Sequence, residues 1–163
     1  MAIYDVEQFL RDIETLYKAK LNDEIAVINA EKTDFTLSDI SDNAWYFQEL
    51  AKQAFSYKNF VVYGILDDPR TLDTMSDNYI REVKVFLEVV IPVDGGKKTE
   101  AEIYKLLRYS RALESVALKN YDRLSRRVTR LKFETLKPNM IDIDDRLRIR
   151  SAGIVISAAL TAR

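Results

Sequence analysis

The chain has 163 residues, and 47% of them are hydrophobic, which is enough for one sizeable core. Its 25 basic and 26 acidic residues nearly cancel, so the net charge indicates neither a nucleic-acid nor a membrane partner. Cysteine and histidine are both absent, which excludes disulfides and the commonest proton shuttle and leaves only oxygen ligands for a metal. We therefore expect one domain over residues 1–163, with no enzymatic activity, no cofactor and no bound metal.

The N-terminal part of the chain predicts one long amphipathic helix over residues 5–31. Asp5 followed by Gln8 resembles a capping box, and apolar residues then recur every three or four positions as far as Ile28. The polar stretch from Thr33 to Asn43 predicts a loop.

Three strands are expected next, at residues 45–47, 60–66 and 79–93, from their aromatic and β-branched content. The third alternates, with valine, leucine and isoleucine at 83, 85, 87, 89 and 91 on one face and Glu82, Lys84 and Glu88 on the other. The polar stretch 67–78, which contains Pro69, predicts an exposed connection.

A second helix is predicted from a capping box at Thr99 and Glu102 to about Lys119. Its expected apolar stripe comprises Ile103, Leu106, Leu107, Leu113 and Val116. Two strands follow, at 128–135 and 147–160. Pro138 and Asn139 are expected to end the first, and Gly153 suggests a bulge in the second.

This order predicts an α+β fold: a single domain with a four- to five-stranded, mainly antiparallel sheet and two helices packed on one face. The uncovered face of the sheet and the long loops are then the surfaces where partners are expected.

The predicted elements resemble the tail terminator proteins of tailed bacteriophages, also called tail completion proteins. The resemblance rests on the order of elements and runs from the first helix to Leu160. It includes the strands Tyr-Phe-Gln-Glu-Leu (46–50), Phe-Val-Val-Tyr-Gly-Ile (60–65) and Val-Lys-Val-Phe-Leu-Glu-Val (83–89), then the capped helix and the final hairpin. No single signature motif carries it.

The resemblance implies a homo-oligomeric ring, six-fold in that family, within the tail or neck of a virion assembled in the host cytoplasm. Such a ring sits on the end of the tail tube, stops its polymerisation and presents a surface to the head connector or neck protein. The tail sheath is a further implied neighbour. DNA passes through the lumen without specific binding, and no membrane is involved.

A closed ring needs two different, complementary faces on each subunit. The weakly charged final strand suggests an edge at Ile154, Val155 and Ile156, with burial inside the fold as the alternative. The remaining interface candidates are Arg146, Arg148 and Arg150, as ion-pair partners on a solvated strand face, and Asp67 and Asp68 in the second loop.

Three other functions compete with the ring. A head-completion or neck adaptor is the nearest, because it would also be a small ring-forming protein. A nucleic-acid-binding accessory protein would use the basic cluster Arg123, Arg126, Arg127, Arg130 and Lys132, for which ion pairing is the more ordinary role. A metal enzyme would use the carboxylates at 67–68 and 142–145, but these lack the spacing of an EF-hand loop.

Overall fold

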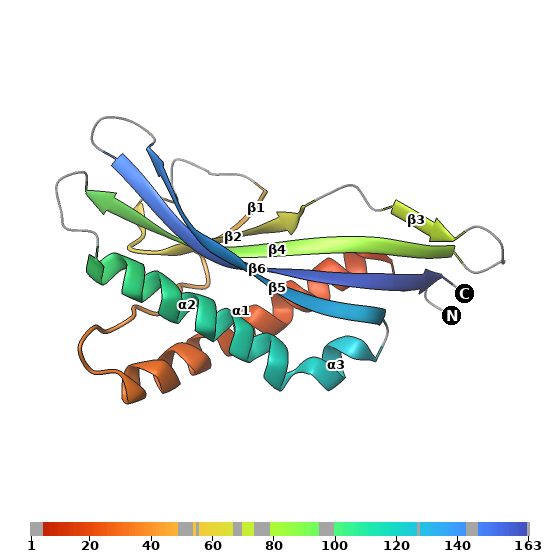
Figure 1. Ribbon diagram of the computed structural model, residues 1–163, viewed down its shortest axis with the longest axis horizontal. Coiled ribbons are helices and arrows are strands. Elements are labelled where there is room, and N and C mark those ends of the chain that lie inside the picture. Colours follow the sequence, from red (N-terminus) through yellow and green to blue (C-terminus); the bar gives the residue numbers. More distant parts are fainter. Residues whose placement is uncertain are drawn as a thin grey trace.

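The computed structural model describes residues 5–48, 54, 56–66, 70–73, 79–94, 100–126, 128–142 and 147–162. Two long helices lie on one face of a single sheet, so the predicted α+β class is confirmed (Figure 1). The helices are α1 (Val6–Glu31), α2 (Glu100–Lys119) and the short α3 (Tyr121–Ser125). The strands are β1 (Trp45–Phe47), β2 (Phe60–Ile65), β3 (Arg70–Asp73), β4 (Tyr79–Asp94), β5 (Val128–Asp142) and β6 (Leu147–Ala162).

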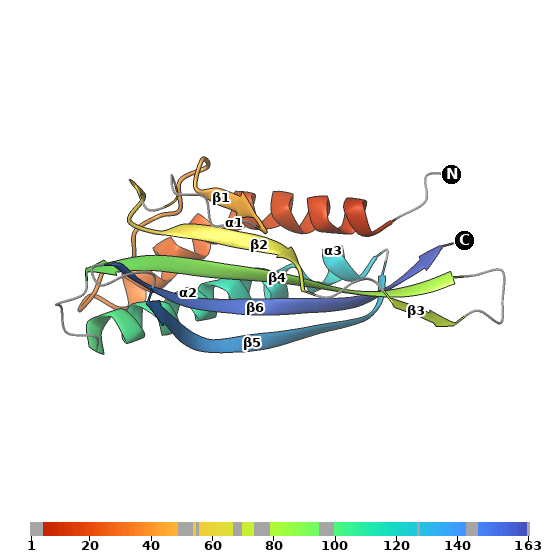
Figure 2. The ribbon, with the colours of Figure 1, turned by 90° about the horizontal axis from the view of Figure 1, so that it is seen from above.

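The sheet is mainly antiparallel and follows the order β1-β2-β4-β6-β5, with β3 paired to β4. Only β1 and β2 run parallel among the strands that the structure describes. The strands β4, β6 and β5 run side by side along the length of the molecule (Figure 2). Their 15 to 16 residues each reach roughly 50 Å at about 3.3 Å per residue, well beyond an average strand.

Two predicted boundaries are wrong. Part of the expected connection between β2 and β4 forms the short strand β3, which pairs with Arg81 and Glu82 of β4 through Thr71 and Arg70. The other error is at Pro138, where β5 was expected to have ended but continues to Asp142. Proline has no N–H to donate, yet β5 lies at the edge of the sheet and has an irregular register between Leu136 and Asn139, and both conditions tolerate a proline.

The bulge suggested at Gly153 lies instead in the neighbouring strand. The register between β4 and β6 is unbroken along its whole length, with Gly153 opposite Glu88. The irregularity is in β5, immediately after Leu136, the residue that pairs with Gly153. Gly153 is needed for a different reason: a Cβ there would lie 2.5 Å from the Leu87 carbonyl oxygen, too close for any other residue.

The first helix forms as its sequence predicts. Asp5 Oδ1 accepts a hydrogen bond from the Gln8 backbone N–H at 2.9 Å, while the Gln8 side chain donates to Asp12 instead of completing the capping box. The buried face consists of Phe9, Ile13, Leu16, Tyr17, Leu21, Ile25 and Ile28. The Tyr17 hydroxyl donates to the Leu113 carbonyl oxygen of α2 at 2.9 Å, so this hydrogen bond fixes the two helices against each other inside the core.

The apolar stripe predicted for α2 is only partly buried. Leu106, Leu113 and Val116 are in the core, but Ile103 and Leu107 are 41% and 48% exposed. The helix packs against α1, β6 and β5 on one side only. Ile103 and Leu107 lie about a third of a turn around the helix from the buried residues. They are therefore not covered by α1, β5 or β6.

The polar segment from residue 33 to 43 is irregular, as predicted, but it is packed and not a freely solvated loop. Leu37 and Ile40 are buried in the core. Two asparagines of α1, two turns apart, bind their backbone: Asn29 binds Leu37, and Asn22 binds Ile40. Each side-chain amide donates to the backbone carbonyl, and each side-chain oxygen accepts from the backbone N–H, all at 2.8–2.9 Å. These bonds replace the missing strand or helix partners of a buried backbone.

We expect Asn29→Asp to lower the free energy of unfolding by about 1–2 kcal/mol, because a carboxylate still accepts from the Leu37 N–H but cannot donate to its carbonyl. Urea denaturation at neutral pH measures the change. The exposed Lys32→Ser serves as a control with almost no expected effect. Equal stability of Asn29→Asp and the original protein would show that the amide donor contributes nothing.

Candidate assembly surfaces

The final strand is not an edge of the sheet, so the location expected for Ile154, Val155 and Ile156 is wrong. β6 pairs with β4 on one side and β5 on the other, and all three residues are buried. Ile154 and Ile156 face the helices, while Val155 lies on the opposite face between Phe86 of β4 and Glu134 of β5. The alternative reading, burial within the fold, is the one that the structure supports.

The arginines of β6 do not form the solvated face that their alternation with Leu147 and Ile149 suggested. Arg150 is only 6% exposed, because it points toward the start of α2, where its Nε lies 3.6 Å from Glu102 Oε2. Arg148 is half-buried. Arg146, Asp67 and Asp68 lie outside the described residues.

Four of the other basic residues are exposed. Arg123 and Arg126 belong to α3 and its C-terminal end, and Arg130 and Lys132 lie near the start of β5. Arg127 is outside the described part of the chain. We call these four exposed residues the basic corner. The acidic Asp122 and Glu134 are exposed among them, so the corner carries an excess of positive charge without being uniformly basic.

Among the described strands, β5 and β1 end the main order of the sheet, and the short β3 is a further edge beside β4. β5 is long, but Lys132, Glu134 and Lys137 are exposed along it, and Pro138 and two register irregularities interrupt it. Charges, proline and bulges are the features that discourage unselective strand pairing at an edge. We therefore expect the side chains of β5, and not its unpaired backbone N–H and C=O groups, to decide what this edge contacts.

Most of the large apolar side chains exposed in the described chain belong to two parts of the fold. The β1 group is Phe47, which is 46% exposed, and Leu66 at the end of β2. The α2–α3 group consists of Ile103, Tyr104, Leu107, Leu118 and Tyr121, of which Leu118 is 66% exposed. Val27 of α1 is the remaining large apolar residue exposed in the described chain.

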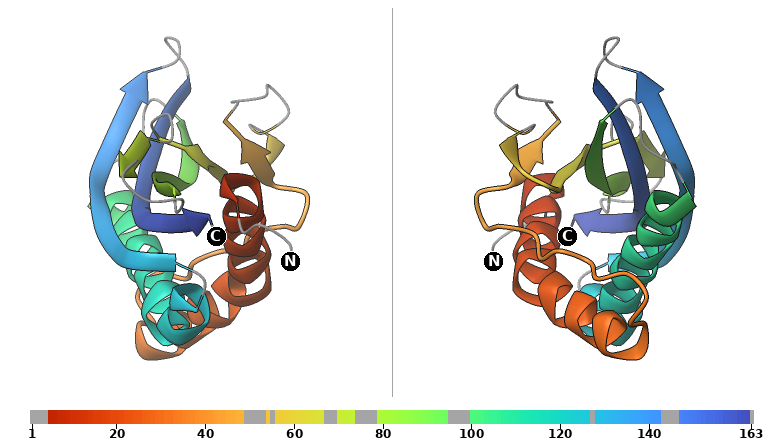
Figure 3. Two further views of the ribbon diagram at one scale, coloured as in Figure 1. Left: turned by 90° about the vertical axis from the view of Figure 1, so that its right-hand side faces the viewer. Right: turned by 90° about the vertical axis from the view of Figure 1, so that its left-hand side faces the viewer.

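The two groups belong to opposite flanks of the molecule. Seen along the strands, α2, α3 and β5 lie on one flank, and β1 with α1 lies on the other (Figure 3). Phe47 packs edge-on against Tyr63 with ring centroids 5.6 Å apart, and Tyr104 stacks on Phe35 at 6.4 Å, so a neighbouring ring positions one member of each group. Exposed apolar side chains are thus carried by elements of both flanks.

A groove runs along α1 on the β1 flank. It has a volume of about 710 Å³ and is lined by Gln8, Arg11, Asp12, Glu14, Thr15, Lys18, Ala19 and Asp42. Lys18 Nζ lies 2.6 Å from Glu14 Oε1 and 5.8 Å from the centre of the Trp45 ring, which joins the groove to β1. Burial acts to raise the pKa of Glu14. Hydrogen bonds with Lys18 and Tyr63 and the charges of Lys18 and Arg11 nevertheless hold that pKa below its usual value.

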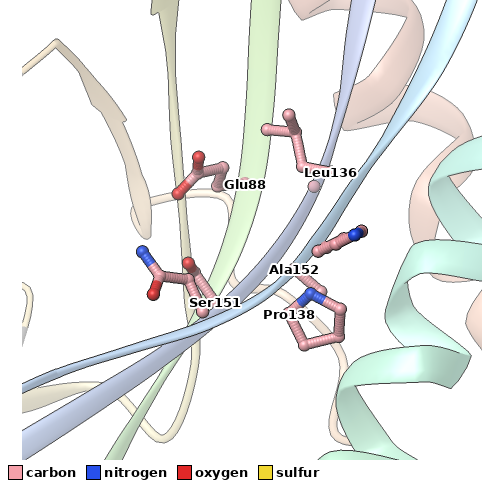
Figure 4. Close-up of a pocket in the computed structure, with 8 residues that line it drawn as sticks. Glu88, Leu136, Pro138, Ser151 and Ala152 are labelled. Carbon is pink, nitrogen blue, oxygen red and sulfur yellow. The ribbon is translucent and has the colours of Figure 1, made fainter.

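A smaller pocket of about 270 Å³ opens on the sheet face away from the helices, beside the bulge of β5 (Figure 4). Glu88, Leu136, Pro138 and Ser151 are among the residues that line it. Burial raises the pKa of Glu88, while a hydrogen bond from Ser151 opposes this. Among the described residues, no neighbour gives this half-buried carboxylate the geometry of an acid–base pair.

The described residues contain no group of three or more acidic side chains placed to hold a metal. None of the helices in that part of the chain is long and apolar enough to cross a membrane.

The sequence reasoning missed the exposed half of the α2–α3 group. Residues 103, 107 and 118 lie on one face of the helix, and 106, 109, 113 and 116 on another, so the sequence offers two apolar faces on one helix. That surplus of apolar positions was the available signal. A comparison of the chain with protein-family models and with curated proteins finds no match.

Proposed function

We propose that this protein is a virion assembly protein, a tail terminator whose copies form a closed ring on the end of a phage tail tube and join it to the head connector. The observation that supports the proposal best is that the elements that carry the two exposed apolar groups lie on opposite flanks. A ring forms through a head-to-tail contact between two different surfaces of one subunit, and each surface must be apolar enough to exclude water.

The charge pattern fits the same function. The basic corner is small and has acidic residues among its four cations. Such a surface suits contacts with proteins better than binding along a run of phosphates. A ring through which DNA slides also gains nothing from tight phosphate contacts. A head-completion or neck adaptor would share the ring, and the two roles differ in the partner: a terminator binds the tip of the tube.

The proposal predicts that the purified protein stops the growth of tubes assembled from the cognate tail-tube protein. Electron microscopy of tube lengths, with and without the protein, measures this effect. Leu118→Asp, which places a charge in the α2–α3 group, is expected to raise the concentration needed for capping at least tenfold, since an interface anchor buried on assembly is commonly worth 2 kcal/mol or more, roughly.

Lys32→Ser, at an exposed site next to α1, is the matched control and should cap as well as the original protein. Tubes that grow to the same lengths with and without the protein would contradict the terminator role. If the protein instead binds a connector protein and leaves the tubes unaffected, the neck adaptor is the correct reading.

A further inference from the structure

The two flanks that would meet in a ring also carry opposite charge, and this points to one specific contact. We infer that the α1 groove of one copy receives the basic corner of the next copy. The inference rests on the proposed ring and adds the identity of the surfaces that close it.

The groove side is acidic on balance. Three carboxylates and two cations line the groove, Asp12, Glu14 and Asp42 against Arg11 and Lys18, and a fourth carboxylate, Glu7, pairs with Arg11. Arg11 lies 2.8 Å from Glu7, and Lys18 lies 2.6 Å from Glu14, so each cation already faces a carboxylate of its own helix. The field that the groove presents to a neighbour is therefore negative.

The opposite flank is basic on balance. Arg123, Arg126, Arg130 and Lys132 are exposed there, against Asp122 and Glu134. Tyr121 is exposed next to them and packs edge-on against Phe133 of β5, with ring centroids 6.2 Å apart. On the groove side, Lys18 lies over the Trp45 ring, and the exposed Phe47 is two residues further along β1. Each charged surface thus borders an apolar one, which is the usual anatomy of an interface with a dry centre and a polar rim.

The two surfaces also lie at the same level along the molecule. The N-terminal half of α1, drawn in red, and α3 both lie toward the end of the molecule where β6 ends, and they occupy opposite flanks (Figures 1 and 3). A head-to-tail contact closes into a flat ring only when the two contacting surfaces have equal height along the ring axis; otherwise it continues as a helix. The groove and the basic corner meet that condition if the strands run along the axis.

Charge-reversed variants that are mixed together test this contact directly. Arg123→Glu with Arg126→Glu reverses the corner, and Asp12→Lys with Asp42→Lys reverses the groove. Each double variant alone should need at least a tenfold higher concentration to assemble than the original protein, because both surfaces then carry the same sign. An equimolar mixture should assemble again, since the reversed corner of one variant fits the reversed groove of the other.

Sedimentation velocity measures the assembly state, and circular dichroism confirms that each variant is folded. A second measurement needs no variants: raising the salt from about 0.05 to about 0.5 M should weaken assembly of the original protein, because exposed charges are then screened. If the original protein assembles but the mixture does not recover, or if the variants assemble as it does, the inferred contact is wrong and the ring stands. If the original protein never assembles, the ring itself is wrong and the contact with it.

Discussion

Gly153→Val is expected to lower the free energy of unfolding by about 3 kcal/mol, at the upper end of what overpacking a core costs. Gly153 lies in the middle of β6, between β4 and β5. A Cβ at this position would lie 2.5 Å from the Leu87 carbonyl oxygen and 2.7 Å from Glu88 Cγ. The first of these contacts is with backbone, so the strands must separate or shift to admit any side chain. Urea denaturation followed by circular dichroism measures the loss.

Ser157→Val is the matched control for this substitution. Ser157 lies on the same face of β6, is only half-buried, and pairs with Lys84 and Lys132 on either side. Valine favours strands, so this variant should change the stability by less than about 1 kcal/mol. If Gly153→Val were as stable as Ser157→Val, the close approach of β4 and β6 at this point would not exist in the folded protein.

Arg150→Ala is expected to cost about 3 kcal/mol for a different reason. The Arg150 side chain is almost fully buried, and its Nε lies 3.6 Å from Glu102 Oε2, an atom that is buried with no hydrogen-bond partner among the described residues. Removing the arginine leaves the Glu102 carboxylate inside the protein without this counter-charge. Breaking one side of a buried pair costs more than the pair itself contributes.

Two comparisons separate the buried charge from other effects of the substitution. Arg150→Met combined with Glu102→Gln removes both charges and should recover most of the lost stability. Arg11→Ala breaks the exposed pair with Glu7 and should cost less than about 0.5 kcal/mol. Thermal and urea unfolding give the values. A loss for Arg150→Ala that is no larger than the loss for Arg11→Ala would mean that the Arg150–Glu102 pair is not buried.

Much of the fold follows from local sequence patterns. The spacing of apolar residues along 5–31 and the alternation from 82 to 89, which only Phe86 interrupts, each favour one secondary structure and one buried face, and both predictions are confirmed. The place of β6 in the sheet could not be predicted in this way. Its run from Ile154 to Leu160 is apolar on both faces, as an exposed assembly edge or a central strand would be, and only the pairing with β4 and β5, far apart in sequence, decides between them.

The candidate surfaces were predicted less well, for related reasons. The solvated face expected for Arg148 and Arg150 is wrong because the first turn of α2 lies close to the start of β6, where Glu102 faces Arg150. Ile103 and Leu107 fit the apolar spacing of α2 as well as the buried residues do, and only the position of α1 leaves them exposed. The sequence of α2 shows that two of its faces are apolar. The packing of the helix against its neighbours decides which face is left for a partner.

Native mass spectrometry of the purified protein over a range of concentrations tests the closed head-to-tail ring most directly, alone and with the tail-tube protein. The ring predicts one discrete species of about six copies of the 18.9 kDa chain, which does not grow further as the concentration rises. A continuous ladder of ever larger species would mean that the contact does not close. A single 18.9 kDa species under every condition, with tube protein present, would contradict self-assembly altogether.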